Sequence, residues 1–277
     1  MDRSANGSMR GVVLVVVGAS GGSGASTLAA ACALRAADIG CSVALVDTVA
    51  GGAGIDVVLG IEHLPGVRWP ELAGCRGRVD GLGLLTRMPR AGAGPVLAHC
   101  RDSPVRVGAG AERGVIAGLS DVVDLVVVDA PRSWSLGGWA ELGGSEGVDA
   151  DESVNRYEGS DDPVSPGPPV GGLALRAVLV AGSGIIELAA LAAAAPRVAA
   201  LVPDTFVVLR GHRLSGTVVS DVERALDLPV LGVLDDDQSV GRDLARGIPP
   251  GRGRGSLADL AQSVIETVAR RRHEAAS

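Results

Sequence analysis

The chain contains no lysine, so all 25 of its basic residues are arginine, and aromatic residues make up only 2% of the sequence. No apolar run approaches the roughly 18 residues that would predict a membrane-spanning helix, and the N-terminus has no signal-peptide pattern. The net charge of −7 disfavours sequence-independent DNA binding, which depends on clustered cations. We therefore expect a cytoplasmic protein, peripheral at a membrane only through partners, with no specific nucleic-acid ligand.

The four cysteines are too few and too scattered for a metal site or a disulfide framework. They form no C-x-x-C pair and have no histidine at metal-ligand spacing: Cys32, Cys41, Cys75 and Cys100. This pattern favours reduced thiols.

A strand, a glycine-rich turn and a helix start follow one another near the N-terminus. The apolar run Val12–Val17 predicts a buried parallel strand, and a helix is expected from about Ser26. Backbone N–H groups of such a turn converge on an anion, and the N-terminal end of the helix adds partial positive charge. The turn therefore predicts a phosphate site made of Gly21, Gly22, Ser23, Gly24, Ala25, Ser26 and Thr27.

This turn departs from the pattern G-x-x-x-x-G-K-[ST] at the position that carries the charge. Ala19 stands at the first glycine and Gly24 matches the second, but Ala25 replaces the lysine. Ser26 keeps the hydroxyl that would contact Mg²⁺. A position that needed a cation could have become arginine, so Ala25 indicates that the loss of charge is tolerated.

Alternating strand and helix patterns predict an α/β fold with a doubly wound, mostly parallel sheet of about seven strands and helices on both faces. At 277 residues and 47% hydrophobic content, we expect one domain over residues 11–272, with a disordered N-terminus at 1–10 and a tail at 273–277. An acidic segment at 133–172 predicts a disordered loop insertion. The expected strands are Val12–Val17, Ser42–Val46, Leu82–Thr86, Leu125–Val128, Ala177–Val180, Thr205–Leu209 and Val230–Val233.

The C-terminal stretch predicts an amphipathic helix with Ser256 as N-cap and Asp259 in the first turn. Its apolar face consists of Leu257, Leu260, Ala261, Val264, Ile265 and Val268. The arginines at 270–272 complement the helix dipole, but they could also contact anionic lipid. We favour packing on the sheet over membrane contact.

Two aspartates follow expected strands. Asp47 ends the second strand, and Asp129 ends the run Leu125–Val128. Four apolar residues that end in aspartate are typical of a strand whose carboxylate lies near a Mg²⁺ shell. Asp47 and Asp129 are therefore the candidate catalytic carboxylates, and Ser26 and Asp129 the candidate Mg²⁺ ligands, direct or through water.

Together these pieces resemble the MinD/ParA family of P-loop ATPases, within it the CpaE/TadZ-like and actinobacterial septum-site-determining (Ssd) branch. The resemblance covers about Val12 to Ala269 outside the acidic segment, and its motifs are the turn at 21–27, Val43–Asp47, Ile55–Gly60, Asp129–Pro131 and Leu228–Val240. The last segment implies that Asp236 and Asp237 lie beside the nucleotide base. Relatives of this branch often carry a receiver-like domain before the loop, and we expect none here.

The resemblance also implies three altered catalytic positions. The family places lysines where this chain has Ser20 and Ala25, and a second acidic residue where it has Val49. Losing one charge-assisted phosphate contact lowers affinity roughly 10- to 100-fold, whereas losing all three groups lowers turnover by orders of magnitude. We expect weak ATP or ADP binding with Mg²⁺, little or no hydrolysis, and no ATP-dependent sandwich dimer. The expected role is spatial: septum placement or assembly of a Flp-type (Tad) pilus, with other proteins of that system as partners.

Two alternatives remain from the sequence. A nucleotide-independent pseudo-ATPase scaffold would use the glycine-rich segment only as a tight turn. A NAD(P)-binding Rossmann protein would use the same glycines for a dinucleotide and Asp47 for a ribose. The second alternative cannot be a short-chain dehydrogenase, because the chain has no lysine for the Tyr-x-x-x-Lys pair and its only tyrosine is Tyr157.

Overall fold

A computed structural model describes residues 10–52, 54–92, 94–101, 105–132, 173–236, 238–252 and 255–274. The acidic segment 133–172, the N-terminal residues 1–9 and Asp237 lie outside the described residues, so the predictions made for them stay predictions.

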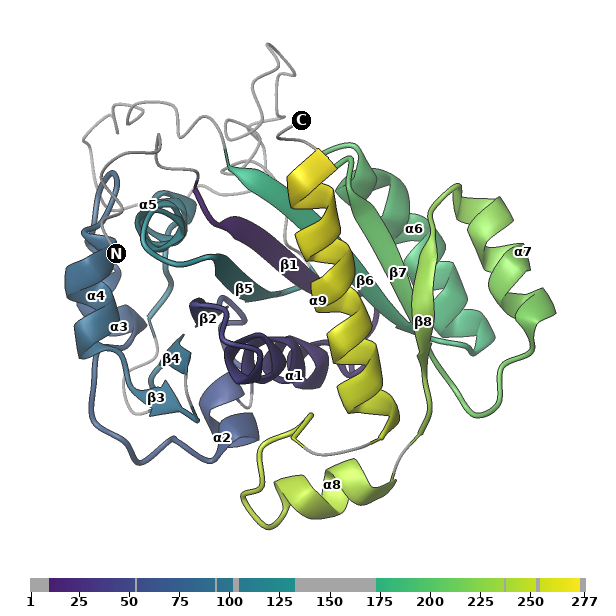
Figure 1. Ribbon diagram of the computed structural model, residues 1–277, viewed down its shortest axis with the longest axis horizontal. Coiled ribbons are helices and arrows are strands. Elements are labelled where there is room, and N and C mark those ends of the chain that lie inside the picture. Colours follow the sequence, from purple (N-terminus) through teal and green to yellow (C-terminus); the bar gives the residue numbers. More distant parts are fainter. Residues whose placement is uncertain are drawn as a thin grey trace.

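One eight-stranded sheet forms the centre of the molecule, in the order β3-β4-β2-β5-β1-β6-β7-β8 (Figure 1). In the part of the chain that the structure describes, only β3 and β4 pair antiparallel, which confirms a mostly parallel α/β fold. The strands are β1 (Val12–Gly18), β2 (Val43–Asp47), β3 (Arg90–Ala91), β4 (Gly94–Leu97), β5 (Leu125–Ala130), β6 (Ala174–Gly182), β7 (Thr205–Arg210) and β8 (Val230–Leu234).

Helices cover both faces of this sheet, and each face has its own apolar core. The helices are α1 (Ala25–Asp38), α2 (Ile55–Leu59), α3 (Trp69–Leu72), α4 (Gly81–Arg87), α5 (Ala109–Ser120), α6 (Ile185–Ala199), α7 (Gly216–Leu226), α8 (Gln238–Leu244) and α9 (Ser256–Glu274). One core lies between the sheet and helices α1, α2 and α9. The other lies between the sheet and helices α3, α4, α5, α6 and α7. Side chains of β1 alternate between the two cores, which explains why its apolar run is unbroken.

One predicted strand is wrong: Leu82–Thr86 lies in helix α4. The Asp80 carboxylate accepts hydrogen bonds from the backbone N–H groups of Leu82 and Gly83, so it caps a helix at this point. Helix α4 packs against α5 where Gly81 approaches the carbonyl of Gly118, and a Cβ on Gly81 would lie 2.0 Å from that oxygen. The sheet position is taken instead by β4, which pairs with β2.

The C-terminal helix exists as predicted, and its apolar face packs against the molecule. Ser256 is the first residue of α9, and the N–H of Asp259 bonds to the carbonyl of Gly255, so the helix begins one residue earlier than an N-cap at Ser256 would place it. All six residues of the predicted face are buried. Figure 1 shows α9 beside α1, and the Arg35 Nε donates to Gln262 Oε1 at 2.7 Å between them. Within the described residues, no helix has the length and apolarity needed to cross a bilayer.

Candidate functional site

The carboxyl ends of the central strands meet at one edge of the sheet, and the glycine-rich turn lies there. It connects β1 to α1, and Gly22 (φ 73°) and Gly24 (φ 92°) hold left-handed conformations that residues with a Cβ rarely adopt. The buried Ser23 side chain fills the space above Gly18, where a Cβ would lie 2.7 Å from Ser23 Oγ. Two glycines and one packed serine thus give the turn its curvature.

This turn borders a cavity of about 530 Å³ that brings most of the predicted site together. Its lining includes the whole predicted phosphate site, 21–27, and the Mg²⁺ candidates Ser26 and Asp129. The remaining lining residues are Gly18, Ser20, Val49, Ala130, Pro131, Arg132 and Arg210. Segments that are more than 180 residues apart in the sequence therefore meet at one site.

Asp129 is the buried carboxylate of this cavity. The residue is 2% exposed, it accepts a hydrogen bond from the Ser26 side chain, and its Oδ1 has no hydrogen-bond partner among the described residues. Burial, and then the charge of Asp47, raise the Asp129 pKa to about 7. Mg²⁺ prefers oxygen ligands, and this site offers a carboxylate oxygen without a partner beside a hydroxyl oxygen. Ser26 and Asp129 therefore fit this ion.

Asp47 ends β2 as expected, and its carboxylate is buried and hydrogen-bonded. It is 1% exposed, and its two carboxylate oxygens accept from the backbone N–H groups of Val49 at 2.8 Å and Ile55 at 3.0 Å. It is not among the residues that line the cavity. Burial raises its pKa to about 6. Asp47 therefore holds the loop between β2 and α2, and its charge raises the pKa of Asp129, its register partner.

The three altered positions all border the cavity, and none carries a charge. Ala25 begins α1, and Val49 lines the cavity from the end of β2. The Ser20 Oγ is buried without a hydrogen-bond partner. These three positions therefore offer no side-chain charge to an anion in the cavity.

The structure adds one residue of the cavity that the sequence did not indicate. Arg210, the last residue of β7, donates from Nη1 to the carbonyl of Gly22 at 2.8 Å and from Nε to Asp236 at 2.7 Å. Asp236, predicted beside a nucleotide base, lines an adjacent cavity of about 290 Å³ together with Arg210. The sequence shows only that Arg210 is a charged residue at the end of an expected strand. The sheet order is needed to show that this strand end lies beside the glycine-rich turn.

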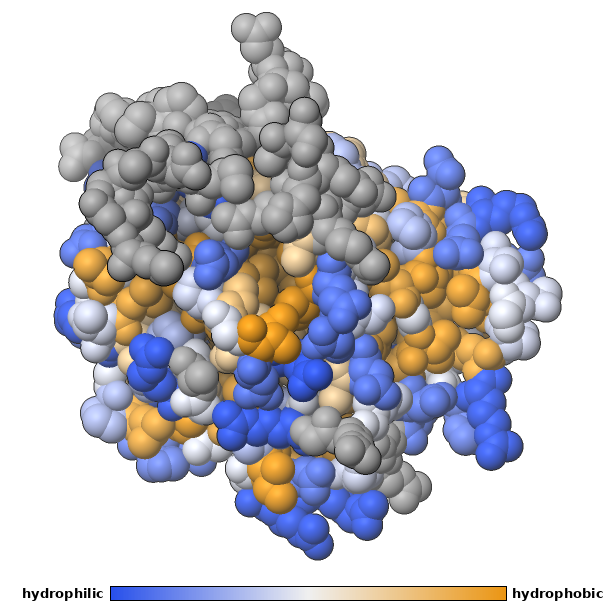
Figure 2. Space-filling model, in the orientation of Figure 1, coloured by the Kyte–Doolittle hydropathy of each residue, from blue (hydrophilic) through white to orange (hydrophobic). Residues whose placement is uncertain are grey.

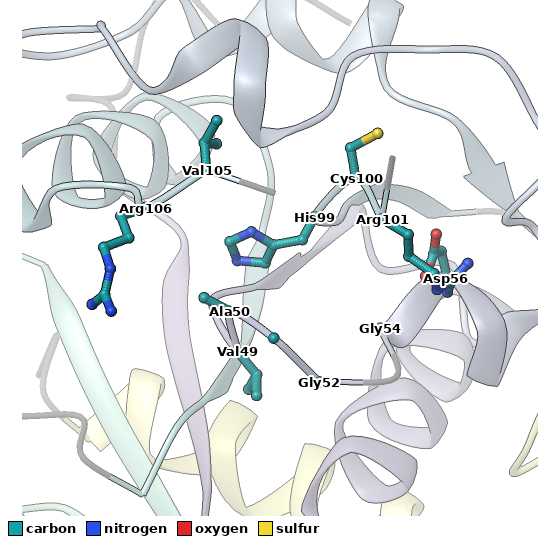
Figure 3. A pocket seen from close by; sticks show the side chains of 11 residues that line it. Val49, Ala50, Gly52, Gly54, Asp56, His99, Cys100, Arg101, Val105 and Arg106 are labelled. Atoms are coloured by element: carbon teal, nitrogen blue, oxygen red, sulfur yellow. Dashed lines mark hydrogen bonds and ion pairs between the residues drawn. The ribbon is translucent and has the colours of Figure 1, made fainter. Parts of the chain in front are cut away.

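A second cavity of about 560 Å³ adjoins the first at Val49. In Figure 3 the His99 ring points towards Ala50, while Arg101 points away to Asp56, with which it pairs at 2.9 Å. The His99 Nε2 is buried without a hydrogen-bond partner, and burial lowers the pKa of His99. This cavity is therefore lined on one side by an imidazole whose protonation is disfavoured by burial.

No protein-family model matches the chain. Two curated proteins of Mycobacterium tuberculosis, one from strain CDC 1551 / Oshkosh and one from strain H37Rv, both named only as uncharacterized, are 31% identical to it over 261 residues. The match covers 94% of this chain, which spans 65% of the length of each relative.

Solved structures of the same fold cover nearly the whole chain. A ParA family ATPase from Chlorobium tepidum has a TM-score of 0.65 at 15% identity, covering 94% of this chain and 99% of that one. The Pyrococcus horikoshii septum site-determining protein MinD, complexed with Mg-ADP, has a TM-score of 0.66 at 18% identity, with coverage of 93% and 95%. A MinC:MinD cell division complex from Aquifex aeolicus gives 0.60 at 17%, with coverage of 95% and 96%.

Proposed function

We propose that this chain, which has the fold of MinD and ParA ATPases, is a spatial regulator that binds ADP or ATP with Mg²⁺ and hydrolyses ATP slowly or not at all. The observation that carries the proposal is the pair of Ser26 and Asp129 below the turn, with Asp129 Oδ1 buried and unpartnered. When bound, Mg²⁺ would neutralise phosphate charge there, and the turn's backbone N–H groups would hold the phosphates.

The site residues favour nucleotide binding over ATP hydrolysis. In this proposal, the backbone of Gly21–Thr27 binds the phosphates, Ser26 and Asp129 hold the ion, and Asp236 lies towards the base. Ala25, Ser20 and Val49 supply neither a cation nor a group that orients water. The MinD structure with Mg-ADP supports the choice of ligand.

The dinucleotide alternative fits the structure less well. In the common dinucleotide fold the first two strands are neighbours, whereas here β5 lies between β1 and β2. Asp47 is buried and already bonded to two backbone N–H groups, so its carboxylate is not presented to a ribose. We therefore do not propose NAD(P) as the ligand.

The cellular role that we propose is placement of a division septum or assembly of a Tad/Flp pilus, as in the CpaE-like and Ssd branch, through partner proteins. The MinC:MinD complex is an example of a protein partner in this fold. Self-association should not depend on ATP, because Ser20 cannot reach a partner's phosphates. The edge strand β8, whose residues 230–233 are only partly buried, offers an apolar surface for it (Figure 2). Sedimentation velocity tests this: a monomer that dimerises only with Mg²⁺-ATP would contradict it.

Calorimetric titration with Mg²⁺-ADP tests the binding itself. Wild type should bind, and Gly24→Val should abolish binding because Gly24 has a φ of 92° and lies in the turn. Gly74→Val is the matched control, since Gly74 is exposed and a Cβ there would meet nothing within 4 Å. A wild type that binds nothing up to millimolar nucleotide would favour the nucleotide-independent scaffold instead.

A further inference from the structure

The phosphate turn lacks the charge that its geometry calls for, and a cation from elsewhere in the chain reaches it. Among the described residues, the cavity is lined by one carboxylate, Asp129, and by two arginines, Arg132 and Arg210. We propose that Arg210 supplies to the nucleotide phosphates the positive charge that Ala25 cannot supply. This inference rests on the proposed nucleotide binding and deepens it.

Contacts with the turn fix the position of the Arg210 guanidinium. Its Nη1 donates to the Gly22 carbonyl at 2.8 Å, and both Cδ and Nη1 lie 3.9 Å from where a Cβ on Gly24 would be. The guanidinium therefore packs against the two glycines with left-handed φ that curve the turn. Arg210 borders both the phosphate cavity and the adjacent 290 Å³ cavity, so it stands between them.

Sheet topology explains how a residue 188 positions beyond Gly22 comes to this place. Strand β6 lies between β1 and β7, and the register pairs Gly18 with Val180 and Gly182 with Arg210. The end of β7 thus extends about as far as the start of the turn. A cation placed there is anchored by the sheet, whereas the usual lysine is anchored by the turn itself.

Arg210 retains the capacity to bind an anion. A guanidinium has five N–H donors, and the described residues use Nε and Nη1, through Asp236 and Gly22. The planar guanidinium can donate hydrogen bonds to two oxygens of one phosphate at once. The side chain is 40% exposed and Asp236 is 54% exposed, so an entering phosphate can compete with the Asp236 carboxylate for the same guanidinium. Asp236 then acts as the partner that holds Arg210 in the nucleotide-free protein.

Titration of Mg²⁺-ADP and Mg²⁺-GDP into wild type and five variants, Arg132→Ala among them, tests this role. Arg210→Ala should weaken both nucleotides about tenfold, because the lost contact is to phosphate and not to base. Arg224→Ala is the control, since Arg224 forms a similar exposed pair with Asp221 at 2.8 Å on α7 and does not line the cavity. Ala25→Lys in the Arg210→Ala background should recover most of the loss. Asp236→Asn should tighten binding a few-fold, and only while Arg210 is present.

Each other outcome has a defined meaning. Wild-type binding that Arg210→Ala leaves unchanged would overturn this inference and leave the proposed function standing. Loss of ADP binding with unchanged GDP binding would place Arg210 at the base, and a tenfold loss in Arg132→Ala alone would assign the charge to Arg132. If the wild type binds neither nucleotide, the proposed function fails and this inference fails with it.

Discussion

At the residue scale, Asp129 is a buried carboxylate whose ionisation opposes folding. Its carboxyl group is buried beside Asp47, and both effects favour the protonated form, which raises the Asp129 pKa to about 7. In the unfolded chain the same group titrates near 4. Between about pH 4 and pH 7 the folded protein therefore binds more protons than the unfolded chain, so the free energy of unfolding decreases as the pH rises through this range.

Replacing this carboxyl by an amide should stabilise the protein without nucleotide. Asp129→Asn removes the buried ionisation, so at pH 8 and in EDTA it should raise the free energy of unfolding by about 2–4 kcal/mol, with little difference at pH 4. Urea denaturation of both proteins across this range measures the effect. If the free energy of unfolding of the two proteins depends on pH in the same way, the pKa of Asp129 is not raised in the folded protein. The same variant should lose Mg²⁺-dependent nucleotide binding.

The sequence predicted the turn, Ser26 and Asp129 because each belongs to a local pattern of strand end and glycine. It assigned Asp47 a role in the chemistry because its position looks like that of Asp129, but hydrogen bonds to Val49 and Ile55 occupy it. Arg210 has no local pattern at all. Its role depends on which strands are neighbours, and that information is not contained in any short segment.

At the scale of elements, six of the seven predicted strands lie in β1, β2, β5, β6, β7 and β8. Five of these strands lie inside the sheet and β8 lies at its edge, and their apolar runs are bounded by polar or glycine residues. The strand predicted at Leu82–Thr86 is wrong because a short apolar run does not distinguish a strand from a helix. The Asp80 carboxylate caps this segment and thereby favours the helix. Strands β3 and β4 were missed because they have two and four residues and include Gly94 and Pro95.

Substitutions in helix α9 can distinguish a helix that packs on the sheet from a helix that binds a membrane. Leu260 is 6% exposed and lies beside Gly232 of β8, so Leu260→Ala should lower the free energy of unfolding by about 2–5 kcal/mol. Glu266→Ala, an exposed change on the same helix, should stay within about 0.5 kcal/mol of wild type. Chemical denaturation compares them. A lipid-binding helix would give the opposite result, with unchanged stability and weaker sedimentation with anionic vesicles.

On the scale of the whole molecule, the parallel sheet gathers the ends of β1, β2, β5, β6 and β7 at one edge. That convergence places a phosphate turn, a buried carboxylate and a distant arginine around one cavity. The sequence predicted the sheet and its edge from composition and alternation. It could not predict the second cavity at His99, because that cavity is formed by the loops after β2 and β4, and β4 was not recognised.

Binding of doubly labelled ATP, with analysis of what is bound, tests the central claim most directly. The purified protein is equilibrated by dialysis against saturating Mg²⁺ and ATP labelled in the base and in the γ-phosphate, and the excess nucleotide on the protein side is counted and identified. We expect wild type to retain about one nucleotide per chain, recovered as ATP with both labels, and Gly24→Val to retain none. An absence of bound nucleotide, or steady release of labelled phosphate that Asp129→Ala abolishes, would contradict the account.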